Sequence, residues 1–220
     1  MFFCYNLSNL KKRIIEFMTY LKNEDWLGTG GERDCYSYPD DKLKVIKIIK
    51  KLDKHNNQNY LEYTYLEYLT EQNIDFSHIP KCYGFIQTNI GEGLVVQRIR
   101  NYDDSEIRTM SFYIKHNLWD DEHAMILIND LKEYLFKNDI LFVDASLSNI
   151  FCQKIAKDKY KLIIFDGLGG RRPGIKFWLY MKLKFFARYK IKKQWEVFLN
   201  NYKYEKSLKI KLENKETIDY

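Results

Sequence analysis

Residues that break or crosslink a fold are scarce in this sequence of 220 residues, which holds three prolines, ten glycines and four cysteines. With so few prolines and glycines, a disordered linker is not expected. The cysteines show no C-x-x-C spacing and lie far apart in the chain, at Cys4, Cys35, Cys82 and Cys152. This pattern argues against a zinc site and a disulfide framework, so we expect reduced thiols.

Long apolar runs are missing as well. No stretch approaches the roughly 18 apolar residues that a membrane-spanning helix needs, and polar residues interrupt the N-terminus too early for a signal peptide. We therefore expect a cytoplasmic protein. The composition is globular, because 45% of the residues are hydrophobic and 16% are aromatic. The net charge of +6 suits an anionic ligand but is modest for a nucleic-acid-binding protein.

The first fifty residues predict a helix followed by a hairpin. Apolar residues at helical spacing indicate an amphipathic helix over residues 8–22, which carries no visible chemistry. A glycine-rich turn with Gly28 and Gly30 then precedes two strands, which are joined by a tight turn at 39–41. Glycines let backbone N–H groups approach a phosphate without an intervening Cβ, although an ordinary hairpin turn has the same composition.

Lys47 lies in the second of these strands, within the alternating apolar run 45–49. A strand lysine often only extends to water. This one follows Gly28 by 19 residues, however, so its ammonium group can reach back under the glycine turn toward the α- and β-phosphates of a nucleotide.

The segment 56–72 predicts a helix whose apolar face is made of Tyr60, Leu61, Tyr65, Leu66 and Leu69. Two glutamates on this helix are candidates to pair with the strand lysine and hold it in place. Glu62 is the first choice, Glu67 remains open, and a solvated helix face is the alternative for either one.

Residues 79–100 predict two further strands around a turn at 88–93, and the second strand runs into a hinge. Backbone groups near Gln97 and Ile99 can hold an adenine edge there. Strand-rich sequence then gives way to helix-rich sequence near Tyr102, which indicates a lobe boundary. Helices are predicted over 105–116 and 121–138, the latter with its buried positions at Ala124, Ile126, Leu127, Leu131, Leu135 and Phe136.

The stretch 140–170 carries the chemistry. Asp144 and Asp166 each end a short apolar run, Asn149 follows Asp144 by five residues, and a hairpin with a polar turn at 157–159 separates the two acids. Asp-x-x-x-x-Asn, a hairpin and then apolar-Asp-Gly is the order in which kinase-like phosphotransferases place a catalytic base and two metal ligands. A carboxylate near the acceptor hydroxyl and oxygen ligands for Mg²⁺ are what phosphoryl transfer requires.

The C-terminal part, residues 171–220, is aromatic and basic, with 14 Lys or Arg against 5 Asp or Glu. Its pattern predicts helix. One interpretation is a helix that packs its aromatic face and leaves its basic face in water. The others are a patch for an anionic sugar, lipid or membrane surface, and a nucleic-acid surface, which no fold signature supports.

Three blocks of the sequence belong together: L-G-T-G-G-E-R-D-C-Y…V-I-K-I, the run G-L-V-V-Q-R-I-R-N-Y-D, and S-L-S-N-I…I-I-F-D-G. Together they resemble the YrbL family, called PhoP regulatory network protein, which belongs with the protein-kinase-like superfamily. The resemblance covers roughly residues 24–200. It implies an α+β fold of two kinase-like lobes in a single domain, with a small antiparallel sheet in residues 1–101 and a mostly helical lobe in 102–220.

The resemblance also implies roles for single residues in an ATP-dependent transfer. Gly28 and Gly30 would cover the phosphates, Lys47 would contact them, and Glu62 would orient the lysine. Asp144 would be the base, while Asn149 and Asp166 would hold Mg²⁺.

The sequence also departs from the kinase pattern. Arg33 stands at the third glycine, Phe142-Val143 replaces the usual His-Arg before the catalytic Asp, and no Ala-Pro-Glu segment follows Asp166. These departures favour a saccharide or glycolipid acceptor in envelope or surface-polymer metabolism over a protein. The alternatives are a catalytically weak, nucleotide-binding regulatory protein of the PhoP network, and a membrane- or nucleic-acid-associated protein led by the basic C-terminal helix.

Overall fold

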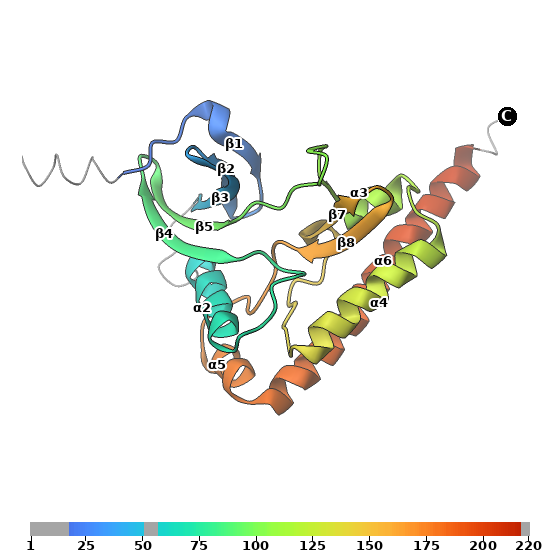
Figure 1. Cartoon of the computed structure of the whole chain (residues 1–220). Coiled ribbons are helices and arrows are strands. Elements are labelled where there is room, and N and C mark those ends of the chain that lie inside the picture. The colour runs from blue at the N-terminus through green and yellow to red at the C-terminus, as the bar shows by residue number, and fades with distance from the viewer. Residues whose placement is uncertain (1–17, 51–56, 217–220) are drawn as a thin grey trace, which may run out of the picture. The chain divides into compact units, whose positions relative to one another are not determined.

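A computed structural model gives an α+β protein and describes residues 18–50 and 57–216, with side chains up to 208 (Figure 1). The described chain divides into two compact units. One comprises residues up to Asn59 together with Cys82–Arg98, and the other comprises Tyr60–Lys81 and the chain from Ile99 onward. We call them the sheet unit and the helical unit.

The sheet unit is built on five antiparallel strands in the order β1-β2-β3-β5-β4. Their bounds are β1 Trp26–Thr29, β2 Arg33–Tyr38, β3 Asp41–Ile49, β4 Cys82–Thr88 and β5 Gly91–Gln97, and a short 3-10 turn, η1 Asn23–Asp25, precedes β1. The core of this unit forms because alternate residues of β3 and β5 face the same side. It consists of Leu21, Ile46, Ile48 and Val95, with Tyr36, Tyr38 and Ile86 packed against it.

Two expectations for this unit need correction. Three strands form where two were predicted, because the glycine-rich turn joins β1 to β2 as a hairpin of its own. Most of the predicted helix 8–22 lies outside the described residues, but its last part is not helical. There Thr19 forms a parallel bridge with Thr88, and the Leu21 amide donates to Asn89 Oδ1 over 2.8 Å.

The helical unit combines five helices of the described chain with a small sheet. The helices are α2 Gln58–Glu71, α3 Met110–Lys115, α4 Asp121–Lys137, α5 Ile175–Lys182 and α6 Lys184–Glu216, and the division between the units passes within α2. The sheet has the order β6-β7-β8, with β6 Arg108–Thr109, β7 Ile150–Ala156 and β8 Lys159–Ile164. A 3-10 turn, η2 Leu147–Asn149, leads into β7.

The helix over 121–138 and the hairpin around 157–159 are confirmed by α4 and by β7–β8. The predicted helix 105–116 is shorter, because residues 108–109 join the sheet and Thr109 caps α3 by accepting from the Phe112 amide. Three predicted core positions were wrong. Tyr60 is 49% exposed, Ile126 61% and Phe136 38%, whereas Ile128 and Tyr134 of α4 are buried in their place.

Helix α6 forms one wall of the helical unit and runs beside α4 (Figure 1). Residues at helical spacing give it a continuous buried stripe of Ala187, Ile191, Trp195, Phe198 and Tyr202. Two ion pairs link α6 to the helical unit at the edge of this buried stripe: Arg188 pairs with Asp139 over 2.8 Å, and Lys206 pairs with Asp121. The aromatic face of the C-terminal helix is therefore packed against the rest of its unit.

Candidate functional site

The loop that carries Asp144 is held by the chain that follows Asp166. Phe142 forms an antiparallel bridge with Leu168. The amides of Val143 and Asp144 both donate to the Gly167 carbonyl, over 2.8 and 3.0 Å. One carbonyl thus holds two consecutive amides, and it places the Asp144 and Asp166 segments side by side in one unit.

Gly167 is the residue that this close approach requires. Its φ of +81° lies in the left-handed region, and a Cβ there would meet the Asp144 Cβ at 2.8 Å and the Asp144 carbonyl at 2.9 Å. The Gly167 amide also donates to Asp166 Oδ1 over 2.8 Å, which orients that carboxylate. The glycine after Asp166 is therefore explained by the fold of the loop itself.

Asn149 joins the two acidic segments from the other side. Its Nδ2 donates to the Asp144 carbonyl over 2.9 Å and to Asp144 Oδ2 over 3.0 Å, while its own carbonyl accepts from the Phe165 amide over 3.0 Å. The η2 turn presents it there, and Ser146 caps this turn by accepting from the Ser148 amide. The structure thus brings together three residues that the sequence predicted as one site: Asp144, Asn149 and Asp166.

Helix α6 supplies a support that sequence reasoning missed. The Asn201 amide group donates to the Ala145 carbonyl over 2.8 Å. Gln194, in the amide orientation that satisfies both of its ends, donates to the Val143 carbonyl over 3.1 Å and accepts from Lys190 Nζ over 2.5 Å. The carbonyls on either side of Asp144 are therefore both held by α6. Polar residues seven apart on one face of an aromatic helix were the available sequence signal.

A further contact reaches Asp144 from the residue that follows Gly170. The Arg171 guanidinium lies 2.9 Å from Asp144 Oδ1, and the two side chains are 71% and 52% exposed. Because both groups are largely in water, this pair contributes little to folding stability. The pair matters because Arg171 contacts the carboxylate of Asp144, the predicted catalytic base.

In the sheet unit, the predicted phosphate-binding turn is a tight hairpin. The Gly30 amide donates to the Arg33 carbonyl over 2.7 Å, and Lys50 Nζ donates to the Gly30 carbonyl over 2.6 Å. Across the described chain, a Cβ added at Gly28 or at Gly31 would meet no atom within 4 Å. Neither packing nor a left-handed backbone therefore requires glycine at these two positions.

Lys47 is buried in the middle of β3, where it pairs with Cys35 of β2 and with Leu94 of β5. Its carbonyl accepts from Asn59 Nδ2 over 2.8 Å, and Asn59 Oδ1 accepts in turn from Arg33 over 3.2 Å. Arg33 of β2 thus holds the Asn59 side chain, through which the start of α2 is bonded to the strand that carries Lys47. Asn59 is a positioning residue that the sequence did not reveal.

The remaining predicted residues lie around the division between the units. Glu62 is buried and Glu67 is half-buried on α2, so Glu62 remains the first choice as the partner of Lys47, and that pairing stays a prediction. Gln97 ends β5 opposite Lys44, and Ile99 is buried where the helical unit begins. Their adenine-binding role also stays a prediction.

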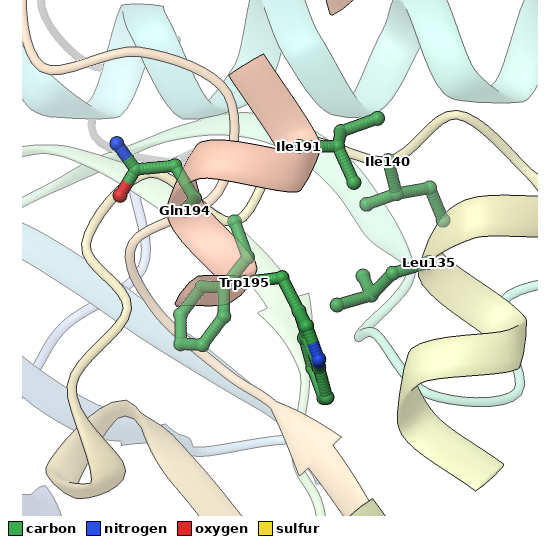
Figure 2. Close-up of a pocket in the computed structure, with 6 residues that line it drawn as sticks. Leu135, Ile140, Ile191, Gln194 and Trp195 are labelled. Carbon is green, nitrogen blue, oxygen red and sulfur yellow. The ribbon is translucent and has the colours of Figure 1, made fainter. Parts of the chain in front are cut away.

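Other candidate sites in the described chain offer less. An apolar hollow behind the Asp144 loop is lined by Leu135, Ile140, Phe142, Ile191, Gln194 and Trp195 (Figure 2). At about 10 Å³ it has room for one water at most, so it is a packing gap. No three His, Cys, Asp or Glu side chains of the described residues cluster as a metal site. Cys35, Cys82 and Cys152 form no disulfide, and Cys4 lies outside the described residues.

Within the described chain, no helix is both long enough and apolar enough to cross a bilayer. The family of the PhoP regulatory network protein YrbL matches residues 19–203. Two relatives, YrbL of Escherichia coli (strain K12) and YrbL of Shigella flexneri, are each 28% identical over 155 residues. The aligned part covers 69% of this chain and 74% of each relative.

Proposed function

The chain belongs to the YrbL family, and from that premise and the geometry above we propose that it is an ATP- and Mg²⁺-dependent phosphotransferase. Its acceptor is the hydroxyl group of a non-protein molecule, a saccharide or glycolipid of envelope or surface-polymer metabolism. It works in the cytoplasm. The single observation that carries this proposal is the loop arrangement in which Gly167 and Asn149 hold Asp144 beside Asp166.

Each residue of this arrangement has a chemical role in the proposal. Asp144 accepts the proton of the acceptor hydroxyl, whose oxygen attacks the γ-phosphorus while the bond to the β,γ-bridging oxygen breaks and ADP leaves. Asn149 and Asp166 offer the amide and carboxylate oxygens that Mg²⁺ prefers, and they would hold the ion that neutralises phosphate charge. Two protein ligands are enough, because Mg²⁺ in such sites also keeps waters and substrate phosphates.

The sheet unit supports the nucleotide half of the proposal. Gly28 and Gly30 would cover the phosphates in this proposal. Packing does not require glycine at Gly28, and glycine there would let a phosphate approach the backbone. Lys47 lies on the strand that follows and would contact the phosphates, with Glu62 orienting it. The hinge near Gln97 and Ile99 would accept the adenine.

A transfer assay on the purified chain tests the proposal, with ATP, Mg²⁺ and a panel of saccharide acceptors. Replacing Asp144→Asn or Asp166→Asn should lower turnover by about 100-fold or more, since each removes a carboxylate that the transition state needs. Asp158→Asn is the matched control, because Asp158 is an exposed aspartate of the β7–β8 turn with φ +58°, which asparagine tolerates. Full activity of both site variants would refute the assigned roles.

The second candidate is a nucleotide-binding regulatory protein with weak or no catalysis. The family description, which names a regulatory network, favours it, as does Phe142-Val143 in place of the usual His-Arg. A rise in melting temperature with ATP–Mg²⁺ that is lost in Lys47→Ala, without transfer to any acceptor, would support this candidate over the first. Transfer that Asp144→Asn abolishes would support the first.

A further inference from the structure

Two positively charged side chains lie near the loop that carries Asp144. Arg171 contacts the Asp144 carboxylate directly over 2.9 Å. Lys190 of α6 reaches the same loop through Gln194, which bridges Lys190 Nζ to the Val143 carbonyl. Two cationic side chains from different elements therefore lie around one predicted catalytic base.

The surroundings of Lys190 are cationic as well. Partial burial lowers the pKa of Lys190, and the positive charges of Arg171, Lys193 and Lys176 lower it further. Gathering like charges in a partly buried place costs folding free energy, and an anion bound among them offsets that cost.

The setting of Arg171 differs from that of the paired basic residues on α6. Arg188 and Lys206 each hold an aspartate at the rim of the helix contact. Arg171, in contrast, is 71% exposed and pairs with an exposed carboxylate, which is a weak interaction in water. Its guanidinium can exchange that carboxylate for a ligand anion at little cost and then bind the ligand with two parallel hydrogen bonds.

We propose that the acceptor carries its own negative charge, a phosphate or carboxylate group near the reacting hydroxyl, and that Arg171 and Lys190 bind it. This inference rests on the proposed phosphotransferase function. When Arg171 turns to the acceptor anion, it releases Asp144 to accept the hydroxyl proton. Neutral saccharides then lack the group that both orients the hydroxyl and frees the base.

Binding of three sugars to the full chain tests this. Glucose 6-phosphate and glucuronate supply the two anionic groups, and glucose is their neutral match. We expect titration calorimetry to detect the charged sugars, with affinity falling as salt is raised, and to detect glucose at least tenfold more weakly. Equal binding of glucose and the charged sugars, or no binding of either charged sugar, would overturn the proposal.

Variants identify the residues. Arg171→Gln and Lys190→Gln should each weaken binding of the charged sugars by roughly tenfold to a hundredfold, the usual cost of losing a charge-assisted hydrogen bond. Lys157→Gln, at an exposed lysine of the β7–β8 turn, should change nothing. Unchanged affinity in both site variants would refute the assignment. Arg171→Gln keeps the test clear of folding effects, because Arg171 is exposed.

ATP–Mg²⁺ binding is measured in the same variants to separate this inference from the proposed function. Binding of ATP without discrimination among the sugars defeats only the acceptor proposal. If the chain prefers the charged sugars but neither binds ATP nor transfers phosphate, the proposed phosphotransferase function is wrong. The chain would then be an anion-binding protein.

A different observation points to a second surface, at the turn where α5 meets α6. Large apolar side chains are exposed together there, with Ile175 79% exposed and Phe185 78%. Trp178, Leu183, Phe186 and Tyr189 are exposed too, and so are Lys182, Lys184 and Lys192 in the same stretch of the chain. We call these residues the α5–α6 corner. Soluble proteins rarely leave so many neighbouring aromatic side chains in water without a partner.

The geometry points to an anionic lipid bilayer as the occupant of the α5–α6 corner. Aromatic and leucine side chains interleaved with lysines are typical of surfaces that lie in the headgroup region, where rings enter the acyl boundary and lysines meet lipid phosphates. The lysines give the charge complementarity, since each adds to the attraction toward an anionic leaflet. A protein surface with acidic residues is a competing occupant that the test distinguishes.

Co-sedimentation with phosphatidylcholine vesicles that contain phosphatidylserine tests this surface. We expect binding that grows with the phosphatidylserine fraction and drops by about tenfold in the double variant Trp178→Ser, Phe185→Ser. Leu118→Ser is the control, because Leu118 is exposed elsewhere in the helical unit. No binding to anionic vesicles, or equal binding by the double variant and the control, would overturn this assignment.

Discussion

The two units hold their candidate residues in opposite ways. In the helical unit, the Asp144 loop is tied by the Gly167 carbonyl, by Asn149 and by two amide side chains of α6. In the sheet unit, Gly28 lies in β1 just before the glycine-rich turn, and a Cβ added to it would touch nothing in the described chain. A site that stabilises a transition state needs fixed groups, whereas a turn that covers phosphates needs an accessible backbone. The difference fits the proposed function, in which the chemistry belongs to the helical unit and the phosphate contact to the sheet unit.

Removing the packing under the Asp144 loop should produce the largest effect. Phe198 is fully buried on α6, and its ring lies against Phe142 and Trp195. Phe198→Ala should lower the free energy of unfolding by about 3–5 kcal/mol, measured by urea denaturation. Val197→Ala, at the exposed neighbouring position, should change it by about 0.5 kcal/mol at most. Equal effects would mean that the loop is not supported by α6.

An alanine substitution at one glycine of each unit, Gly167 and Gly28, compares the two units directly. Gly167→Ala should cost about 1–3 kcal/mol of stability, because alanine at φ +81° is strained and its Cβ meets Asp144. Gly28→Ala should leave stability within about 1 kcal/mol, since nothing is crowded, but should weaken ATP–Mg²⁺ binding if phosphates approach this backbone. Melting curves with and without nucleotide measure both. A large loss of stability in Gly28→Ala would show that the fold of the sheet unit also requires its glycine.

Two asparagines allow the amide supports of the units to be compared. Asn59 is buried and donates to the Lys47 carbonyl, so Asn59→Ala should cost about 1–3 kcal/mol by leaving a buried acceptor unsatisfied. Asn201 is only half-buried, and Asn201→Ala should cost about 0.5–1.5 kcal/mol. Chemical denaturation gives both values. The reverse order would show that the helical unit, not the sheet unit, depends more on its amide.

The smallest expected effect is a pH dependence confined to the helical unit. Burial lowers the pKa of His78, whose Nδ1 lies 2.8 Å from the Leu162 carbonyl. The folded chain therefore binds the proton less well than the unfolded chain, in which the pKa is about 6.5. Stability is complete above that value and decreases as the pH falls below it. Denaturation between about pH 7.5 and 5 should show this decrease, and His78→Gln should reduce it. An unchanged slope in the variant would contradict the assignment.

The sequence predicted the fold best where local pattern and burial agree. The α4 helix and the β7–β8 hairpin formed where periodicity and turn residues placed them. Prediction failed where a long-range contact decides. Tyr60 has the spacing of a core residue but is exposed. Residues 18–22 are not helical, and Thr19 and Leu21 bond instead to the β4–β5 hairpin, about 68 residues away. Local sequence carries no information on such partners.

By itself, the sequence determined which groups could do chemistry and their order along the chain, because oxygen ligands, a lysine and glycines are chosen by residue type. Asp144, Asn149 and Asp166 were recognisable in this way. Only the tertiary structure decided what surrounds them. Arg171 lies on the predicted base, and α6 brings Lys190, Gln194 and Asn201 to the same loop from far along the chain. Hydrogen bonds and close charge pairs act over a few ångströms in space. The surroundings of a functional group are therefore set by tertiary packing rather than by the residues next to it in the sequence.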